Sequence, residues 1–354
     1  MSILRDCFAV RPVTEADLKG SGKLKKVLTA WSLTAIGLGA TIGTGVFVLT
    51  GQVAANQAGP AITISLLVAA FGSALAALCY AELAAFLPVP GSAYSYTYAT
   101  LGEIIAWLIG WNLLLEYGMS ASAVAVSWSA YVVNLLDGWG LNFLPKALTN
   151  APLKAVNDHI EQTGAIFNVP AALIIAAMSY VCYVGMRETA GLNTAMVSLK
   201  VLIIIAFIIA GIGYINTANW HPYIPANTGS FGHFGWTGVL QGAGIIFFSY
   251  VGFDTASTTA LEARNPQRDL PIGIIGALLI SVLLYVGMST VLTGMVPYTQ
   301  LGVDAPVVWV PFDCAGCLSA ADQADHFVAV FNERTDQCFA DESVGTADED
   351  FHGP

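Results

Sequence analysis

Charged residues are scarce in this chain of 354 residues. Asp, Glu, Lys and Arg together make up 10 % of it, whereas 56 % of its residues are apolar and its mean hydropathy is +0.67. A soluble domain rarely combines these values, because its surface needs charge. The composition therefore excludes an ordinary soluble domain and predicts that lipid surrounds most of the chain.

The patterns typical of disulfides, metal sites and nucleic-acid binding are missing as well. The six cysteines lie at positions 7, 79, 182, 314, 317 and 338. They follow no disulfide framework, and Cys314–Cys317 is a single CxxC pair. His221 and His233 lack the spacing of metal ligands, and no basic patch is interleaved with aromatic residues. We therefore expect no disulfide, no metal and no nucleic acid partner.

A cleavable signal peptide is also missing, because residues 1–29 contain no apolar core segment. They form instead a basic arm with Arg5, Arg11, Lys19, Lys23, Lys25 and Lys26. Connections predicted on the same side of the membrane add Arg187, Arg264 and Arg268, whereas the opposite side carries Lys146 and Lys154. Because cytoplasmic loops are richer in Lys and Arg, the N-terminus is predicted to be cytoplasmic, in a multi-pass protein of the cell membrane.

Long apolar segments dominate what is present. Seven of them follow the basic arm: residues 30–50, 60–87, 104–136, 169–186, 192–215, 239–262 and 271–296. Runs of about 20 apolar residues are typical of transmembrane helices. The sequence therefore predicts an all-α membrane domain over residues 30–306, with the seventh helix ending outside.

Two of these segments are interrupted in the middle. The first carries Gly43-Thr44-Gly45, and the sixth carries Gly252-Phe253-Asp254. Helix-weakening residues at membrane depth leave backbone groups unpaired, which is tolerated where they line a cavity or hold a ligand. At the first break, free N–H groups and the helix dipole could hold a carboxylate. The alternative is that Gly39 and Gly43 form a small-residue packing face.

Three sets of motifs on successive spans carry a resemblance to a known family. They are Ala35–Phe47 (AIGLGATIGTGVF), Tyr80–Leu83 (YAEL) with Pro90–Tyr94 (PGSAY), and Phe247–Asp254 (FFSYVGFD) followed by Asn265–Pro271 (NPQRDLP). In this order the chain resembles amino acid permeases of the amino acid-polyamine-organocation superfamily, above all the cationic amino acid transporter branch, over about residues 20–306. The resemblance implies a leucine-transporter-like fold of inverted repeats, in which helices 1 and 6 are discontinuous.

The resemblance also implies where a substrate binds. Its carboxylate would contact the first break, at Ile42, Gly43, Thr44 and Gly45. Its ammonium would meet backbone carbonyls of the second break, at Phe248, Ser249 and Val251. The rings of Phe248 and Phe253 could cover the bound substrate, and plain packing is the alternative for both.

Three charged residues lie at membrane depth, where a charge needs a partner or a function. Asp254 could act in the site or stabilise the broken helix by accepting local N–H bonds. Glu116 would face the cavity by its position in the family and favour a cationic substrate, with a bond inside the bundle as its alternative. Lys200 occupies the place of a coupling sodium ion in related transporters, so it is either a proton-coupling residue or a fixed structural cation.

The resemblance ends near residue 306, although it implies an eighth span soon after residue 315. Residues 307–354 contain no apolar run long enough to cross a membrane, and they hold 10 acidic residues against one basic residue, Arg334. We expect this segment to be an acidic, disordered tail unrelated to the family. A frameshift or gene truncation that replaced the remaining helices is our hypothesis for it.

The sequence thus predicts a secondary transporter and not an enzyme. The expected activity is proton-coupled symport of cationic amino acids such as arginine, lysine and ornithine, driven by the proton gradient without a bound cofactor. Its partners would be the amino acid substrate and the lipid bilayer. A permease for neutral amino acids and a non-functional truncated fragment stay open as alternatives. A seven-span receptor fits less well, because its N-terminus would be outside and its helices unbroken.

Overall fold

The computed structural model describes residues 10, 26–138, 145–156, 159–184, 186–303 and 306–307. These residues belong to the first of two units into which the chain divides, Met1–Val308. The basic arm and the acidic tail therefore lie almost wholly outside the described residues, together with Cys7 and the three cysteines after position 306. Cys79 and Cys182, which are described, are free thiols, as expected.

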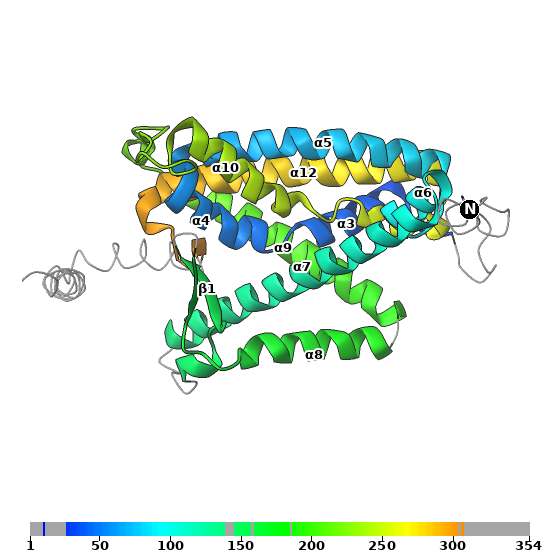
Figure 1. Ribbon diagram of the computed structural model, residues 1–354, viewed down its shortest axis with the longest axis horizontal. Coiled ribbons are helices and arrows are strands. Elements are labelled where there is room, and N and C mark those ends of the chain that lie inside the picture. Colours follow the sequence, from blue (N-terminus) through cyan, green and yellow to red (C-terminus); the bar gives the residue numbers. More distant parts are fainter. Residues whose placement is uncertain are drawn as a thin grey trace, which may run out of the picture. The chain divides into compact units, whose positions relative to one another are not determined.

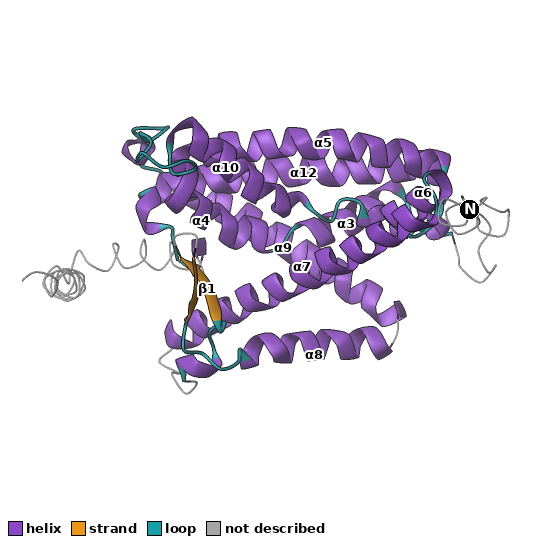
Figure 2. Cartoon of the chain, in the orientation of Figure 1, coloured by secondary structure: helices purple, strands orange, loops and turns teal. Residues whose placement is uncertain are grey.

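Helices make up most of the described chain (Figure 2). The α-helices are α3 (Ala30–Thr41), α4 (Thr50–Val53), α5 (Ile62–Phe86), α6 (Ser92–Thr100), α7 (Glu103–Gly138), α8 (Val169–Val184), α9 (Met186–Ile212), α10 (Gly235–Phe247), α11 (Thr255–Thr258) and α12 (Pro266–Met295). The shorter turns are π-helical η1 (Gly45–Leu49) and η2 (Ala54–Ala58), and 3-10 η3 (Gly59–Ala61), η4 (Lys146–Leu148), η5 (Thr217–Trp220), η6 (Phe248–Tyr250), η7 (Ala260–Glu262) and η8 (Tyr298–Gln300).

One β-hairpin departs from the expected all-α fold. Strands β1 (Leu153–Val156) and β2 (His159–Gln162) pair antiparallel in the connection between α7 and α8, with Leu153 opposite Gln162 (Figure 2). The hairpin lies in a connecting segment and leaves the helical spans intact. The apolar runs gave no signal for it, because it belongs to the polar stretch between two of them.

Five helical segments are long and apolar enough to cross a membrane. They are Gly45–Phe86, Glu103–Leu136, Thr194–Ile212, Gly235–Thr258 and Pro266–Met295. The apolar helix Val169–Tyr183 falls short of that length, and α3 has 12 residues before the first break. These findings indicate a multi-pass helical membrane protein, while the count of seven spans and the inverted repeat stay predictions.

The core forms where α12 packs against α5 and α3, and where α10 packs against α5 (Figure 1). Helix α5 buries mainly small side chains, among them Ala69, Ser73 and Ala77, and small residues let helix backbones approach closely. Leu33 of α3 and Leu270 of α12 are fully buried in this core. The packing fixes the helices that carry the two interruptions.

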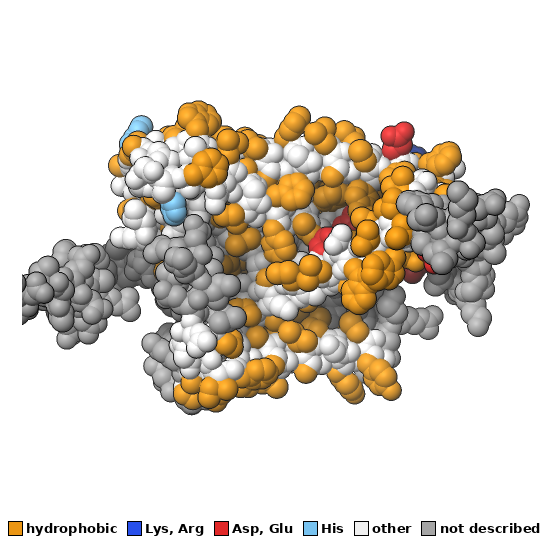
Figure 3. All heavy atoms as spheres, in the orientation of Figure 1, with side chains coloured by type: hydrophobic (Ala, Val, Ile, Leu, Met, Phe, Trp, Pro, Cys, Tyr) orange, Lys and Arg blue, Asp and Glu red, His pale blue; other side chains and the backbone are white. Residues whose placement is uncertain are grey.

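Helices α7 and α9 lie at the periphery of the described part. Only 11 % of the apolar window in Glu103–Leu136 and 17 % of that in Thr194–Ile212 is buried, compared with 50 % for Gly235–Thr258. Figure 3 shows apolar side chains spread across the visible face. A helix surface of this composition is suited to lipid, because helices already satisfy their own backbone hydrogen bonds.

Candidate substrate-binding site

The first predicted interruption is present in the structure. Helix α3 ends at Thr41, the backbone of Ile42 is extended (φ −73°, ψ 103°), and η1 begins at Gly45. The first N–H groups of a helix have no partner within it, and the helix dipole adds partial positive charge at that end. The start of the helical run Gly45–Ala58 is therefore suited to bind an anion.

The second predicted interruption is present as well. Helix α10 ends at Phe247, η6 adds one tight turn, and Val251 is extended (ψ 135°). Gly252 then takes φ +115°, a left-handed conformation that favours glycine, and α11 begins only at Thr255. Unwound backbone of this kind turns carbonyl oxygens away from the helix axis, where they can accept hydrogen bonds from a ligand.

The two interruptions are in direct contact. A Cβ atom added to Gly45 would overlap the Ser249 side chain and lie 2.7 Å from the Ser249 Cα. A Cβ atom added to Gly252 would lie 2.8 Å from the carbonyl carbon of Ala40. Glycine is thus required at both positions by close approach of the neighbouring chain, and the contact brings the two interruptions side by side.

Tyr285 joins the two breaks from α12. The single proton of its hydroxyl is shared between the carbonyl oxygens of Thr41, at 2.8 Å, and Ser249, at 3.2 Å, and its side chain is fully buried. The Tyr285 ring stacks on Tyr250 with centroids 5.3 Å apart. Sequence reasoning missed this residue; the available signal was a tyrosine inside an apolar span, since a buried tyrosine hydroxyl usually finds a partner.

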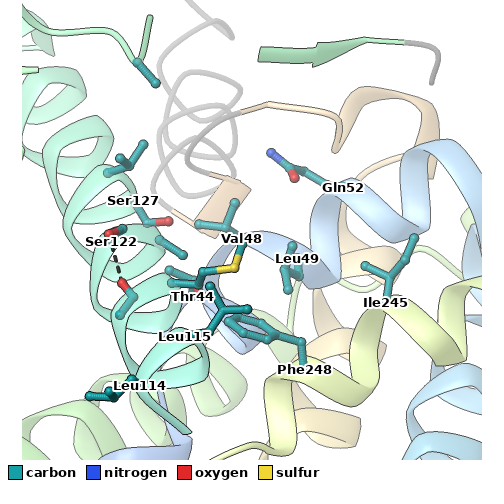
Figure 4. A pocket seen from close by; sticks show the side chains of 15 residues that line it. Thr44, Val48, Leu49, Gln52, Leu114, Leu115, Ser122, Ser127, Ile245 and Phe248 are labelled. Carbon is teal, nitrogen blue, oxygen red and sulfur yellow. Dashed lines mark hydrogen bonds between the residues drawn. The ribbon is translucent and has the colours of Figure 1, made fainter. Parts of the chain in front are cut away.

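A cavity of about 960 Å³ lies beside the breaks (Figure 4). Thr44 and Val48 line it from the first interrupted helix, Ile245 and Phe248 from the second, and α7 adds side chains such as Leu115. The Phe248 ring points toward Leu115 in Figure 4. None of the described residues that line this cavity is charged. Its chemistry suits a compact ligand with an apolar portion.

Residues 28–312 match the family described as amino acid permease. This chain belongs to the amino acid permease family. The resemblance inferred from the motifs is therefore confirmed, and the match spans both interrupted helices.

The relatives of this chain are named after different transported compounds. It is 45 % identical over 301 residues to the methylthioribose transporter of Bacillus subtilis, covering 85 % of this chain and 62 % of the relative. It is 45 % identical over 293 residues to the branched-chain amino acid permease BcaP of the same organism, covering 82 % and 60 %. It is 42 % identical over 287 residues to cationic amino acid transporter 9, chloroplastic, of Arabidopsis thaliana, covering 80 % and 48 %.

The chain spans about 60 % of the length of the first two of these relatives. All three are transporters or permeases, consistent with the expectation that the permease is not an enzyme. Their names include both branched-chain and cationic amino acids, so family membership leaves the substrate class open.

Lys200 of the permease lies against the end of α3. Its ammonium donates to the carbonyl oxygens of Ile42, at 2.8 Å, and Gly39, at 3.2 Å. Carbonyls at the C-terminal end of a helix lack intrahelical partners and carry partial negative charge, so a cation stabilises that end. The ammonium therefore neutralises the helix end that the first break creates.

Asp254 lies buried at the head of α11. Its carboxylate accepts hydrogen bonds from the hydroxyls of Ser92, at 2.8 Å, and Tyr117, at 3.3 Å. The sequence had left open a bond to local N–H groups, but Asp254 makes no side-chain cap bond to α11. Glu116 is half-buried and close enough to Asp254 for the two carboxylates to repel each other. It is not among the residues that line the cavity.

Phe253 has a different environment from Phe248. Its side chain is buried and meets the Tyr80 ring edge-on, with centroids 5.9 Å apart. Phe248 instead lines the cavity. The packing alternative therefore suits Phe253, and a role in covering the substrate remains a prediction for Phe248.

Replacing Tyr285 with phenylalanine is expected to weaken substrate binding by about tenfold. The two breaks lose the hydroxyl that links their carbonyl oxygens, and losing a buried hydrogen bond costs about 1–3 kcal/mol. Binding of labelled leucine and arginine to purified protein measures the effect. The matched control is Tyr250→Phe, which keeps the ring stacked on Tyr285 and removes a hydroxyl that donates to Leu66 O at 3.2 Å. Equal losses of affinity in both variants would contradict a specific role for Tyr285.

Proposed function

We propose that the permease is a secondary carrier that binds an α-amino acid at its two helix breaks. The observation that supports this most is the contact of Gly45 with Ser249, which brings a helix N-terminus next to the turn that precedes the unwound backbone. An α-amino acid carries a carboxylate and an ammonium on one carbon. A site that offers N–H donors and carbonyl acceptors side by side complements both groups.

The predicted contacts fit the hydrogen bonds already present. The N–H groups at Gly43, Thr44 and Gly45 would hold the carboxylate. Phe248 O accepts from the Val251 N–H at 3.2 Å, and Ser249 O accepts from Tyr285. Each carbonyl oxygen has two lone pairs, so both keep capacity for the substrate ammonium.

An amino acid with an apolar side chain is the first candidate substrate. The cavity beside Thr44 and Phe248 has an apolar lining without charge, so a cationic side chain would lose hydration there without a partner. Cationic amino acids are the second candidate, favoured by Glu116 and Asp254. Two neighbouring carboxylates without a cation create a negative potential that attracts a cationic side chain near the second break.

Proton coupling through Lys200 is part of the proposal. The Lys200 ammonium holds the end of α3 through two carbonyls, so removing its proton would weaken that hold and release the first break to move. The proton gradient would then drive uptake. We place the membrane domain at residues 30–306, in the cell membrane with the N-terminus in the cytoplasm.

Uptake into proteoliposomes tests the proposed function. We expect saturable accumulation of labelled leucine that exceeds that of arginine, increases with an inwardly directed proton gradient, and collapses when the gradient is dissipated. The variant Glu116→Gln distinguishes the two substrate classes. Leucine uptake should stay within about twofold of the parent rate, since Glu116 does not line the cavity. Arginine uptake should be abolished if the carboxylate attracts the cationic side chain. Absence of saturable uptake of either amino acid would contradict the proposal.

A further inference from the structure

A strained turn precedes helix α6. Gly91 has φ +115° and Ser92, the first residue of α6, has φ +51°, so two successive residues adopt the left-handed conformation where the helix begins. Serine rarely adopts this conformation, and strain of this kind persists where the surrounding structure imposes it. The turn is reinforced by Ser95, whose hydroxyl donates to Pro90 O at 2.7 Å.

The turn directs one side chain into the protein. Ser92 is 2 % exposed and its hydroxyl donates to Asp254, which is 5 % exposed. A second contact joins the same helices, because Tyr96 of α6 lies beside Ser257 of α11. The strained turn thus ends in a buried hydrogen bond between α6 and the carboxylate at the head of α11.

The half-helix that Asp254 begins is also tied to the first interrupted helix. Residues 27–28, just before α3, donate backbone hydrogen bonds to Glu262 O, and Arg264 N–H donates to Leu28 O. Helix α11 also packs against α3. Any movement of α11 that opens the site therefore carries α3 with it, and must first separate Asp254 from Ser92.

We propose that Ser92 is a positioning residue whose hydroxyl latches α6 to Asp254 and so holds α11, which follows the second break, and α3, which precedes the first, in the closed arrangement. This inference rests on the proposed carrier function. The bond is short, buried and made to a carboxylate, and hydrogen bonds to charged groups are among the stronger ones in proteins. Losing it is expected to raise the open population about tenfold.

Accessibility of a buried cysteine tests the latch directly. The probe is Ser257→Cys, in a chain whose six native cysteines are replaced by serine. Because Ser257 is fully buried, the cysteine can react with a small maleimide only when the protein opens, and the reaction rate measures that opening. Ser92→Gly is the main variant, because glycine adopts the left-handed backbone without strain and removes the side chain together with its hydroxyl. We expect it to react about tenfold faster than the parent.

Two further variants complete the set. Ser92→Asn tolerates the left-handed backbone and keeps a donor, so it should react at nearly the parent rate. Thr100→Ala is the matched control, since the exposed Thr100 at the end of α6 bonds back to Tyr96 O within its own helix, and it should change nothing. Ser92→Ala serves as a second test at the same position if the glycine variant does not fold.

Transport kinetics separate the latch from the carrier function. In proteoliposomes, Ser92→Gly should raise KM for external leucine in proportion to the fall in the closed population, while the maximal exchange rate is kept. Parental reaction rates and KM in both Ser92→Gly and Ser92→Ala would overturn the latch. If the parent takes up no amino acid yet Ser92→Gly still speeds the cysteine reaction tenfold, the latch stands and the proposed function falls.

Discussion

Replacing Gly45 with valine is expected to abolish amino acid uptake by the permease. Even one added carbon at this position would overlap Ser249 and lie 2.7 Å from its Cα, and a branched side chain needs more room still. The neighbour is backbone of the second break, which cannot rotate away as a flexible side chain could. The two breaks must therefore separate, and the donors and acceptors of the proposed site separate with them.

The loss of substrate binding in Gly45→Val can be measured separately from a loss of folding. Forcing a larger side chain into a packed contact costs about 1–3 kcal/mol in stability, so the protein should still insert and remain helical. Binding of leucine should fall by at least about a hundredfold, because a misplacement of about 1 Å at a binding site carries a penalty of that order. Equilibrium binding and circular dichroism on the same sample separate loss of the site from loss of the fold.

A glycine elsewhere in the same interrupted helices provides the control. Gly244 lies in α10, one turn before the second break, and an added Cβ there would meet nothing within 4 Å. Gly244→Val should therefore keep uptake and binding close to those of the parent. If Gly45→Val transports normally, or if Gly244→Val is equally impaired, the contact between the breaks does not form the site.

The sequence predicted both interruptions because their cause is local. Glycine at membrane depth weakens a helix wherever the chain packs, so Gly45 and Gly252 could be read without knowing their neighbours. The contact between the two breaks could not be predicted from the sequence in this way. It depends on which residues face each other across some 200 positions of chain, and one sequence contains no record of that pairing.

Long-range hydrogen bonds explain most of what the sequence missed. Tyr285 bonds Thr41 across 244 positions, and Ser92 bonds Asp254 across 162 positions. The local pattern offers a polar hydroxyl inside an apolar span for Tyr285 and a place in the PGSAY motif for Ser92, but neither signal names the distant partner. The left-handed turn at Ser92 was likewise hidden, because serine at that position gives no glycine-like signal of a positive φ.

Glu116 shows what a residue's position in a family motif can predict and what it cannot. It lies in α7, near Asp254 and not among the side chains that line the cavity, and its depth in the membrane and its role toward a substrate stay predictions. The direction in which a helical side chain points depends on rotation about the helix axis, and α7 is apolar on most of its circumference. Periodicity therefore could not fix which face of α7 meets the site.

Replacing Lys200 with methionine is expected to reduce proton-driven uptake by at least about tenfold. The substitution keeps the length and apolar stem of the side chain but removes the donor that Gly39 O and Ile42 O share. Two helix-end carbonyls then lack a partner, and a lost hydrogen bond from a charged donor costs about 1.5–3 kcal/mol. The end of α3 should become mobile, and uptake driven by the proton gradient should fall accordingly.

Lys200→Gln decides between the two roles that the sequence left open. Glutamine keeps N–H donors but has neither a positive charge nor a titratable proton, so it can replace neither a fixed cation nor a proton carrier. If Lys200 couples protons, Lys200→Gln should still exchange labelled leucine across the membrane at near-parental rates while accumulation no longer responds to the gradient. If Lys200 is a fixed cation, the same variant should lose exchange and gradient-driven uptake in equal proportion. Normal gradient-driven accumulation in Lys200→Gln would contradict both roles, because neither a charge nor a proton at this position would then be needed.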